Sequence, residues 1–416
     1  MTVVHVIGAG LAGLSAAAAL AEKGARVELH EAAPQAGGRC RSYFDPTLDQ
    51  TIDNGNHLIL SGNDAVFEYL RRIGSERCLI GPDSARFDFV ELPTGERWTI
   101  TPNEGAAPWW TFVEDRRVPG TRFADYLGLV GLVWPRRSAT IIESVKARGA
   151  LWDRLLRPFL LAALNTEPEA ASAQLAAAVI RKTLLRGGRA YHPRIAHPTL
   201  ASAFVEPALA FLESKGAAIR FGRRLKRIVF SGRIATALEF PETTIPLSVT
   251  DTVVLAVPSW SAEELLSPIK APDAFRAIVN AHFKTPPPKD APLMLGVIGG
   301  TVEWIFCFPD RISVTVSAAD RLIDMDRDSL ARLLWRDVAA ALGLSDGPPP
   351  WQIVKEKRAT FAATPEQAGR RPGARGPWMN LFLAGDWTDT GLPSTIEGAV
   401  RSGHRAARLA LQRLAL

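Results

Sequence analysis

The sequence VVHVIGAGLAGLSAAAALAEKGARVELHE occupies residues 3–31 and decides the fold. Its apolar start, residues 3–7, predicts a buried parallel strand, and residues 11–23 predict an alanine-rich helix. Residues 25–30 predict a second strand. Because the two strands are joined through a helix, they are expected to run parallel as one βαβ unit.

The turn between the first strand and the helix has the spacing GxGxxG. Gly8 allows the tight turn, Gly10 lets the backbone approach a pyrophosphate, and Gly13 lets the helix pack close to the sheet. The first helical turn, with Leu11 and Ala12, supplies amide donors and a partial positive charge. Since a strand precedes this turn and a helix follows it, the spacing predicts a dinucleotide site.

Two features after the second strand narrow the choice of dinucleotide. Glu31 lies 18 residues after Gly13, where an acid can accept both ribose hydroxyls, so FAD or NAD is favoured over NADP. Gly37, Gly38 and Arg39 follow with the spacing found in FAD proteins of the amine oxidase and carotenoid desaturase superfamily. This resemblance implies that Arg39 pairs with the pyrophosphate, and it favours FAD.

The C-terminal segment completes the predicted flavin site. LFLAGDW resembles the superfamily's strand followed by Gly385 and Asp386, in which the acid hydrogen-bonds the ribityl chain. A helix is expected to begin at about Thr395, and its first amides, near Ile396 and Glu397, would face the flavin and stabilise its anionic reduced form. Glu397 is expected both to interact with the helix dipole and to contact the cofactor. The closing motif has no cysteine, so non-covalent binding is expected.

The chain is predicted to cross between two domains several times. Residues 1–62, 198–260 and 376–416 are expected to form an FAD-binding domain, with one helix over residues 199–216, and residues 63–197 and 261–375 a substrate domain. Residues 63–197 are expected to be mainly helical, with no strand alternation after about Ile100. The predicted fold class is therefore α/β: a Rossmann-like, two-dinucleotide-binding-domain flavoprotein with a mixed helical and sheet substrate domain, both discontinuous in sequence.

Composition excludes several other classes of protein. The 416 residues are 47% hydrophobic and 22% charged, as in ordinary globular proteins. The net charge is +6, but the basic residues are dispersed, so no nucleic-acid partner is expected. Three cysteines without a CxxC pair predict neither a disulfide framework nor a metal site, and they favour the reducing cytoplasm. No apolar run reaches the roughly 18 residues that a membrane span needs.

Central segments carry a more specific resemblance. They are DNGNHLILSGN (residues 53–63), RPFLLAALNTEP (157–168), WIFCFPDRISVTVSAAD (304–320) and EKRATFAATP (356–365). Together with the closing motif they resemble the hydroxysqualene dehydroxylase family, the squalene-associated bacterial members of the superfamily. The resemblance implies a reductive step of squalene and hopanoid biosynthesis, in which the C30 isoprenoid hydroxysqualene loses its allylic hydroxyl and gains a hydride from FADH2 to give squalene.

This reaction needs an acid for the leaving hydroxyl and an apolar tunnel for the isoprenoid. In similar proteins the segment with Asp53, Gly55, Asn56 and His57 runs past the flavin ring. His57 can shuttle a proton near neutral pH, so His57 and Asp53 are the candidate catalytic residues, although a structural role for His57 stays open. Gly55, Asn56 and Leu225 are candidate flavin contacts. Residues that could line the tunnel, or be ordinary core, are Phe159, Leu160, Leu161 and Leu164.

Two alternative functions remain at this point. The first is an FAD-dependent desaturase or amine oxidase of the same superfamily, although Thr395 stands where amine oxidases usually have an aromatic residue. The second is a flavin-bearing carrier of prenyl lipids without catalytic activity. The electron donor is not identified by the sequence.

The segment from Phe123 to Arg137 suggests where a lipid could enter. It combines apolar residues with Arg136 and Arg137, as in a surface that meets anionic headgroups, but a buried helix capped by two exposed arginines fits equally well. A cytoplasmic location with peripheral contact to the inner face of the cytoplasmic membrane is therefore expected. Transfer from the preceding synthase is the other route for the substrate.

Overall fold

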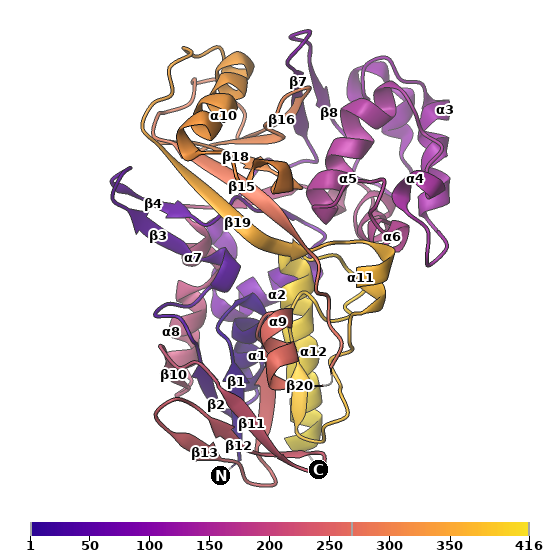
Figure 1. Cartoon of the computed structure of the whole chain (residues 1–416). Coiled ribbons are helices and arrows are strands. Elements are labelled where there is room, and N and C mark those ends of the chain that lie inside the picture. Colours follow the sequence, from indigo (N-terminus) through magenta and orange to yellow (C-terminus); the bar gives the residue numbers. More distant parts are fainter. Residues whose placement is uncertain (1, 268, 415–416) are drawn as a thin grey trace.

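The structure is a computed structural model that describes residues 2–267 and 269–414. One domain carries both chain ends at its base, and a second domain lies above it, with a group of short helices to one side (Figure 1). The architecture mixes helices and sheets and has the predicted α/β class.

A five-stranded parallel sheet forms the centre of the lower domain, in the order β10-β2-β1-β14-β20. Segments that are far apart in sequence therefore pair side by side, as the discontinuous prediction requires. The strands are β1 (Val3–Ile7), β2 (Arg26–His30), β10 (Ala218–Arg220), β14 (Thr252–Leu255) and β20 (Leu381–Leu383). The helices on one face are α1 (Leu11–Glu22), α2 (Asp64–Ile73), α8 (Glu206–Ser214) and α12 (Ile396–Leu414).

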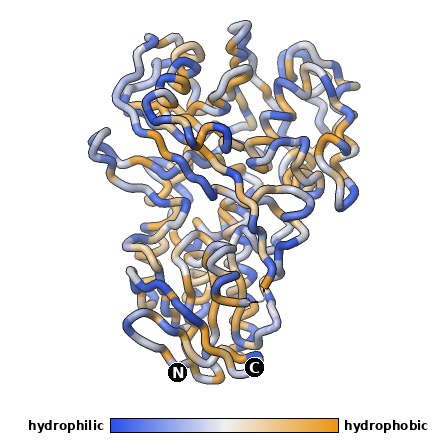
Figure 2. Tube along the Cα trace, viewed as in Figure 1, coloured by the Kyte–Doolittle hydropathy of each residue, from blue (hydrophilic) through white to orange (hydrophobic). Residues whose placement is uncertain are grey.

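Close packing between α1 and α12 holds the two ends of the chain together. A Cβ on Gly403 would lie 2.1 Å from Ser15 Oγ and 2.2 Å from Ala12 O, so only glycine permits this approach. Ser15 donates a hydrogen bond to Val400 O across the same contact. Figure 2 shows apolar and polar residues alternating along the trace of the lower domain, with much of its centre apolar. The packing places the first and last helices of this domain together against one face of the sheet.

The other face of the sheet is covered by a small antiparallel sheet and a short helix. The sheet has the order β11-β12-β13, and its apolar residues share a core with those of β14 and β20. The bounds are β11 (Arg227–Ser231), β12 (Ile234–Glu239), β13 (Thr244–Pro246) and α9 (Ser259–Leu265). Helix α9 spans the predicted domain boundary at residue 260.

The upper domain is built on a seven-stranded sheet with the order β19-β15-β18-β17-β16-β7-β8. Helix α10 (Arg327–Leu342) buries one face, and the short helices lie toward the other (Figure 1). The strands are β7 (Phe87–Glu91), β8 (Arg97–Ile100), β15 (Phe275–Phe283), β16 (Met294–Ile298), β17 (Trp304–Cys307), β18 (Ile312–Val316) and β19 (Trp351–Phe361). Two smaller sheets contain β3 (Ser42–Asp45) with β4 (Gln50–Asp53), and β5 (Leu58–Leu60) with β6 (Leu79–Ile80) and β9 (Pro193–Ala196).

The helical part of the substrate domain consists of short helices joined by 3₁₀ and π-helical turns. Its helices are α3 (Phe123–Tyr126), α4 (Ile141–Ser144), α5 (Arg157–Leu164) and α6 (Ala173–Lys182), and α11 (Pro365–Gly369) lies beside them. Within the described residues, no helix is long and apolar enough to cross a bilayer.

The expectation of one helix over residues 199–216 was wrong, and two other segments of the chain need description. Residues 199–216 form two helices, α7 (Leu200–Phe204) and α8, because Pro207 in the first turn of α8 cannot continue the helix before it. Strand β9 occurs after Ile100, but it has four residues and begins with a proline, so it shows no alternation. The segment from Phe123 to Arg137 is one α-helical turn followed by 3₁₀ turns and not a single helix.

Candidate functional site

The glycine turn after β1 has the geometry that a pyrophosphate site requires. Gly8 has φ +103°, and a Cβ there would lie 2.5 Å from Ala256 O. A Cβ on Gly13 would lie 1.8 Å from Gly8 O, so α1 begins tightly against the turn. Gly10 differs, because a Cβ there would meet nothing within 4 Å. The backbone at Gly10 therefore borders open space at the N-terminus of α1, where Leu11 begins the helix.

The GGR segment lies directly against this turn. Gly37 N donates to Ala9 O at 2.8 Å, and Gly38 Cα faces Gly10, since a Cβ on Gly38 would lie 3.4 Å from Gly10 Cα. Ala12, in the first turn of α1, is buried behind them. The structure thus brings the two predicted pyrophosphate segments into direct contact with each other.

Glu31 leaves the end of β2 beside the turn. Its Oε2 accepts a hydrogen bond from Ala9 N at 2.6 Å, and its Oε1 accepts one from Ala33 N at 2.8 Å. Each carboxylate oxygen retains a second lone pair, and the side chain is partly exposed. The acid is therefore fixed in position and still able to accept hydroxyl groups.

Arg39 and Asp386 come from opposite ends of the chain and form an ion pair. Arg39 Nη2 donates to Asp386 Oδ1 at 2.6 Å, and Nη1 donates to Ala359 O of β19. Ser394 Oγ donates to the other oxygen of Asp386. Burial alone would raise the pKa of Asp386, but the charge and hydrogen bond of Arg39, the hydrogen bond from Ser394 and the charge of Arg371 together outweigh it, and the pKa is lowered. The carboxylate is therefore held ionised beside Gly385, where the lower domain meets the substrate sheet.

The start of α12 follows this pair in sequence. Gly398 N donates to Thr395 Oγ1, and α12 begins at Ile396. The side chain of Glu397 is turned toward α2, since its oxygens accept from Ala65 N at 3.3 Å and Val66 N at 3.0 Å. The carboxylate of Glu397 therefore interacts with the N-terminus of α2. Only the backbone of Glu397 is left to contact a flavin.

The segment from Asp53 to Asn56 is fixed by the substrate sheet and α7. Asp53 Oδ1 accepts from Ser42 Oγ and from Leu200 N at 2.9 Å, so its carboxylate caps α7. A Cβ on Gly55 would lie 2.9 Å from Asn280 Nδ2. Asn56 Nδ2 donates to Thr315 Oγ1 at 3.2 Å. The polar side chains of Asp53 and Asn56 are therefore engaged in holding this segment against its neighbours.

His57 is partly accessible and lies near the charge of Arg39. Burial, with a smaller contribution from the charge of Arg39, lowers the pKa of His57 to about 4. The ring is consequently neutral at pH 7, which makes it a weak proton donor there. It remains a hydrogen-bonding group near the charge of Arg39.

The apolar residues predicted for the tunnel lie in a large shared core. Leu160, Leu161 and Leu164 of α5 are at most 5% exposed, whereas Phe159 is half-buried. Leu225 is also buried in this core. Two hollows in the described surface, near Thr47 and near His197, contain none of the predicted site residues.

The structure also reveals an acid that the sequence analysis missed. Glu303 precedes β17 and accepts a hydrogen bond from Ser317 N at 2.9 Å. Burial raises the pKa of Glu303 to about 7, and the charge of Glu167 contributes in the same direction. Asn165, from the same segment as Glu167, accepts a hydrogen bond from Ala318 N at 2.6 Å. Glu303 thus lies where two of the resemblance-carrying segments meet, an adjacency that only the tertiary structure shows.

Comparison with known proteins gives concordant results. The chain matches the family described as flavin containing amine oxidoreductase over residues 11–411. It is 53% identical to the hydroxysqualene dehydroxylase of Rhodopseudomonas palustris and 51% identical to that of Sinorhizobium fredii, in each case over 98% of both chains. Among solved structures, cyclohexylamine oxidase from Brevibacterium oxydans superposes with a TM-score of 0.71 at 17% identity, covering 100% of both chains. This last similarity concerns the fold.

Proposed function

Because the chain belongs to the hydroxysqualene dehydroxylase family, within the flavin containing amine oxidoreductases, we propose that it removes the allylic hydroxyl of hydroxysqualene to give squalene. The observation that carries the proposal is 51–53% identity over nearly the whole of two relatives with that name. The product and substrate place the step in squalene and hopanoid biosynthesis. In the balanced reaction the carbinol carbon gains a hydride, the hydroxyl gains a proton, and water leaves.

We propose that the flavin is FAD and that it is bound without a covalent bond. The open space at Gly10 and the free lone pairs of Glu31 suit a dinucleotide with an unmodified ribose. Arg39 and Asp386 would hold the middle of the cofactor, and the first amides of α12 would face the ring. When bound and reduced, the flavin supplies the hydride. The remaining contacts expected, from Gly37, Gly38, Gly55, Asn56, Leu225, Thr395 and Ile396, stay part of this proposal.

The proton for the leaving hydroxyl needs a donor that is protonated near neutral pH. Asp53 is engaged in capping α7, and His57 is neutral because burial lowers its pKa to about 4. Glu303 is better suited, since burial raises its pKa to about 7 and half of the carboxyl groups carry a proton at that pH. We therefore add Glu303 as a candidate proton donor beside His57, with His57 orienting the hydroxyl through a hydrogen bond.

The apolar face of the upper domain would bind the isoprenoid chain. Half-buried Phe159 of α5 packs against a shared core that also contains Trp152, which precedes α5, and Trp98 and Trp304 of the substrate sheet. Their burial excludes water. In such surroundings an allylic alcohol ionises only where a proton donor and a hydride donor are both positioned. The apolar area that the substrate buries, and with it the free energy of binding, would then increase with the length of the isoprenoid chain.

The protein is proposed to work in the cytoplasm and to dock on the inner face of the cytoplasmic membrane. Leu127, Val130 and Trp134 are 55%, 60% and 83% exposed, and Arg136 and Arg137 follow them. Leu132 is fully buried, so the segment is anchored on one side and presents apolar residues on the other. Such a surface fits anionic lipid, and a water-insoluble substrate could enter there or arrive from the preceding synthase.

The reaction is tested by anaerobic incubation of the photoreduced protein with hydroxysqualene. We expect the flavin to be reoxidised without oxygen and squalene to form in equal amount. Squalene without flavin reoxidation, or reoxidation only when oxygen is admitted with formation of hydrogen peroxide, would show an oxidase or a carrier instead. Incubation with squalene in place of hydroxysqualene is the control and should leave the flavin reduced.

A further inference from the structure

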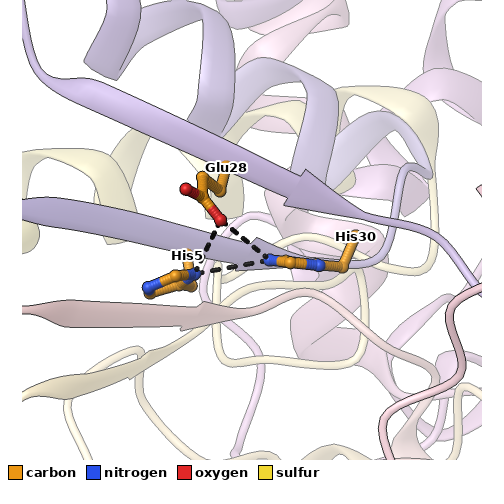
Figure 3. Close-up of side chains that lie close together, drawn as sticks. All are labelled: His5, Glu28 and His30. Carbon is orange, nitrogen blue, oxygen red and sulfur yellow. Dashed lines mark hydrogen bonds and ion pairs between the residues drawn. The ribbon is translucent and has the colours of Figure 1, made fainter. Parts of the chain in front are cut away.

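Three polar side chains face one another on the side of the parallel sheet that is turned away from α1. Val4, Val6 and their neighbours on β2 pack against the helices, so the alternation of the strands directs His5, Glu28 and His30 to the opposite face. Figure 3 shows the two rings and the carboxylate converging from β1 and β2. His5 and His30 are buried, and the side chain of Glu28 is 17% exposed.

Hydrogen bonding accounts for only one of the three contacts. His5 Nδ1 and His30 Nε2 share a hydrogen bond of 3.3 Å, which is at the long end of the range. Glu28 Oε2 lies 3.8 Å from His5 Nδ1 and 3.9 Å from His30 Nε2, beyond hydrogen-bond distance from either. The carboxylate oxygen Glu28 Oε2 is thus almost equally far from the two ring nitrogens and accepts a hydrogen bond from neither.

One atom of each side chain lies close enough to the other two for a shared cation, with all three atoms within 4.8 Å of one another. A tetrahedral zinc ion with bonds of about 2.0–2.1 Å holds its ligand atoms about 3.3–3.4 Å apart, which matches the separation of the two ring nitrogens. The two distances to Glu28 Oε2 are about 0.5 Å longer, so the partly exposed carboxylate would move toward the rings when an ion binds. We propose that His5, Glu28 and His30 form a binding site for a divalent transition-metal ion of the zinc class, with a fourth position left for water. This revises the expectation from the sequence that the chain has no metal site.

The surroundings are compatible with such an ion. Both rings are buried, and an imidazole in its neutral form has a lone pair for a metal. The side chain of Glu28 is partly exposed, so an ion could reach the site from solvent. Asp251 adds a negative charge near His5. Arg220 and Arg223 lie near His30, and Arg26 lies near Glu28; their positive charge limits the affinity.

The site would tie β1 to β2 next to the dinucleotide turn. His30 O accepts the Gly8 N–H at 2.7 Å, and Glu31 follows His30 directly. The ring of His30 also packs on Phe240 of the covering sheet, with centroids 5.0 Å apart. A metal at this place would therefore stabilise the strand ends that position the glycine turn and the acid, and it would not take part in the reaction.

The test is a cobalt titration of protein purified without a histidine tag and freed of metal by a chelator. Tetrahedral cobalt absorbs visible light, so the wild type should develop a new absorption that saturates at one equivalent and disappears when zinc is added. Zinc should raise the thermal midpoint by a few degrees. Glu28→Gln and His5→Gln should each weaken cobalt binding at least tenfold. Retained flavin absorption and circular dichroism verify that the variants fold.

His192→Ala is the matched control, because His192 pairs with Glu104 at 3.0 Å on the surface and offers the same ligand types in an open position. It should bind cobalt like the wild type. The proposal is overturned if the wild type shows no saturable absorption, or if Glu28→Gln and His5→Gln bind cobalt as tightly as the wild type does. Neither result would bear on the proposed dehydroxylation.

Discussion

At the scale of single residues, a substitution at Gly10 best distinguishes an effect on cofactor binding from an effect on folding. An added side chain would meet no protein atom within 4 Å of its Cβ, so the protein should fold, but the side chain would occupy the space assigned to the pyrophosphate. Gly10→Val should therefore lose at least tenfold in flavin affinity, about 1.4 kcal/mol. Flavin content after gel filtration measures this.

Gly347→Val is the control for that substitution. Gly347 also has nothing within 4 Å of an added Cβ, and it lies in a loop of the other domain. It should keep full flavin content and the same circular dichroism. Equal flavin retention in both variants would disprove the placement of the pyrophosphate at Gly10.

The pH dependence of turnover distinguishes Glu303 from His57. A donor whose pKa is raised to about 7 is active below that pH and loses its proton above it, so turnover should fall as pH rises through 7. If protonated His57 were the donor, turnover would already fall above pH 4, since burial lowers its pKa to about 4. Glu303→Gln should reduce turnover by about 10²-fold or more with the flavin retained.

His57→Asn provides the comparison, because asparagine keeps a hydrogen bond but carries no acidic proton. If His57 only orients the hydroxyl, this variant should lose far less turnover than Glu303→Gln and keep the wild-type pH profile. A normal Glu303→Gln enzyme together with an inactive His57→Asn enzyme would return the role of donor to His57.

Residues whose role depends on local chain geometry could be predicted from the sequence. The glycine turn, Glu31 and the GGR segment lie beside one another because the strand, turn and helix that position them are contiguous, and their contacts with FAD are part of the proposal. Glu303 and the cluster of His5, Glu28 and His30 could not be found in this way. Their neighbours belong to other strands, and burial, which sets the properties of Glu303, is a tertiary effect.

At the scale of elements, strands and helices with strong patterns were predicted closely, and short elements were not. β1 has the predicted bounds, residues 3–7. β2 begins one residue later than predicted, at residue 26, and α1 ends one residue earlier, at residue 22. The break between α7 and α8 at Val205 was missed because both halves are apolar and the proline lies in the first turn of the second helix. The partners of β9 lie far away in sequence, and pairing alone makes it a strand.

The segment from Phe123 to Arg137 yields a prediction at this scale. Its exposed apolar residues should bind vesicles in a way that survives salt, and each arginine should add roughly 1 kcal/mol that salt removes. Co-sedimentation with anionic vesicles should thus be partial and stronger at low salt than at high salt. Arg136→Glu with Arg137→Glu should weaken it, and Trp134→Ser should weaken the salt-resistant part.

Arg405→Glu with Arg408→Glu is the matched control, since both residues are exposed on α12, in the other domain. It changes the net charge equally and should leave vesicle binding unchanged. If the wild type stays in the supernatant with anionic vesicles, the docking surface is refuted and the substrate must be transferred from a partner.

At the scale of the whole molecule, the fold explains why the chain ends matter to one site. The parallel sheet places β1, β14 and β20 side by side, so that the first turn, Asp386 and α12 meet although they are separated by more than 300 residues. The sequence motifs predicted this meeting because each belongs to a strand end at the same edge of a parallel sheet. The substrate domain could be predicted only as a class, since its sheet is assembled from strands with long and irregular connections.

The most direct test of the central claim follows the hydride itself. The protein is reconstituted with the 5-deaza analogue of FAD, reduced and labelled with deuterium at the carbon that replaces N5, where the label does not exchange with water. Single turnover with hydroxysqualene should give squalene that carries one deuterium at the former carbinol carbon. Squalene without the label, or no squalene from protein that retains the bound analogue, would contradict a reductive dehydroxylation by hydride transfer.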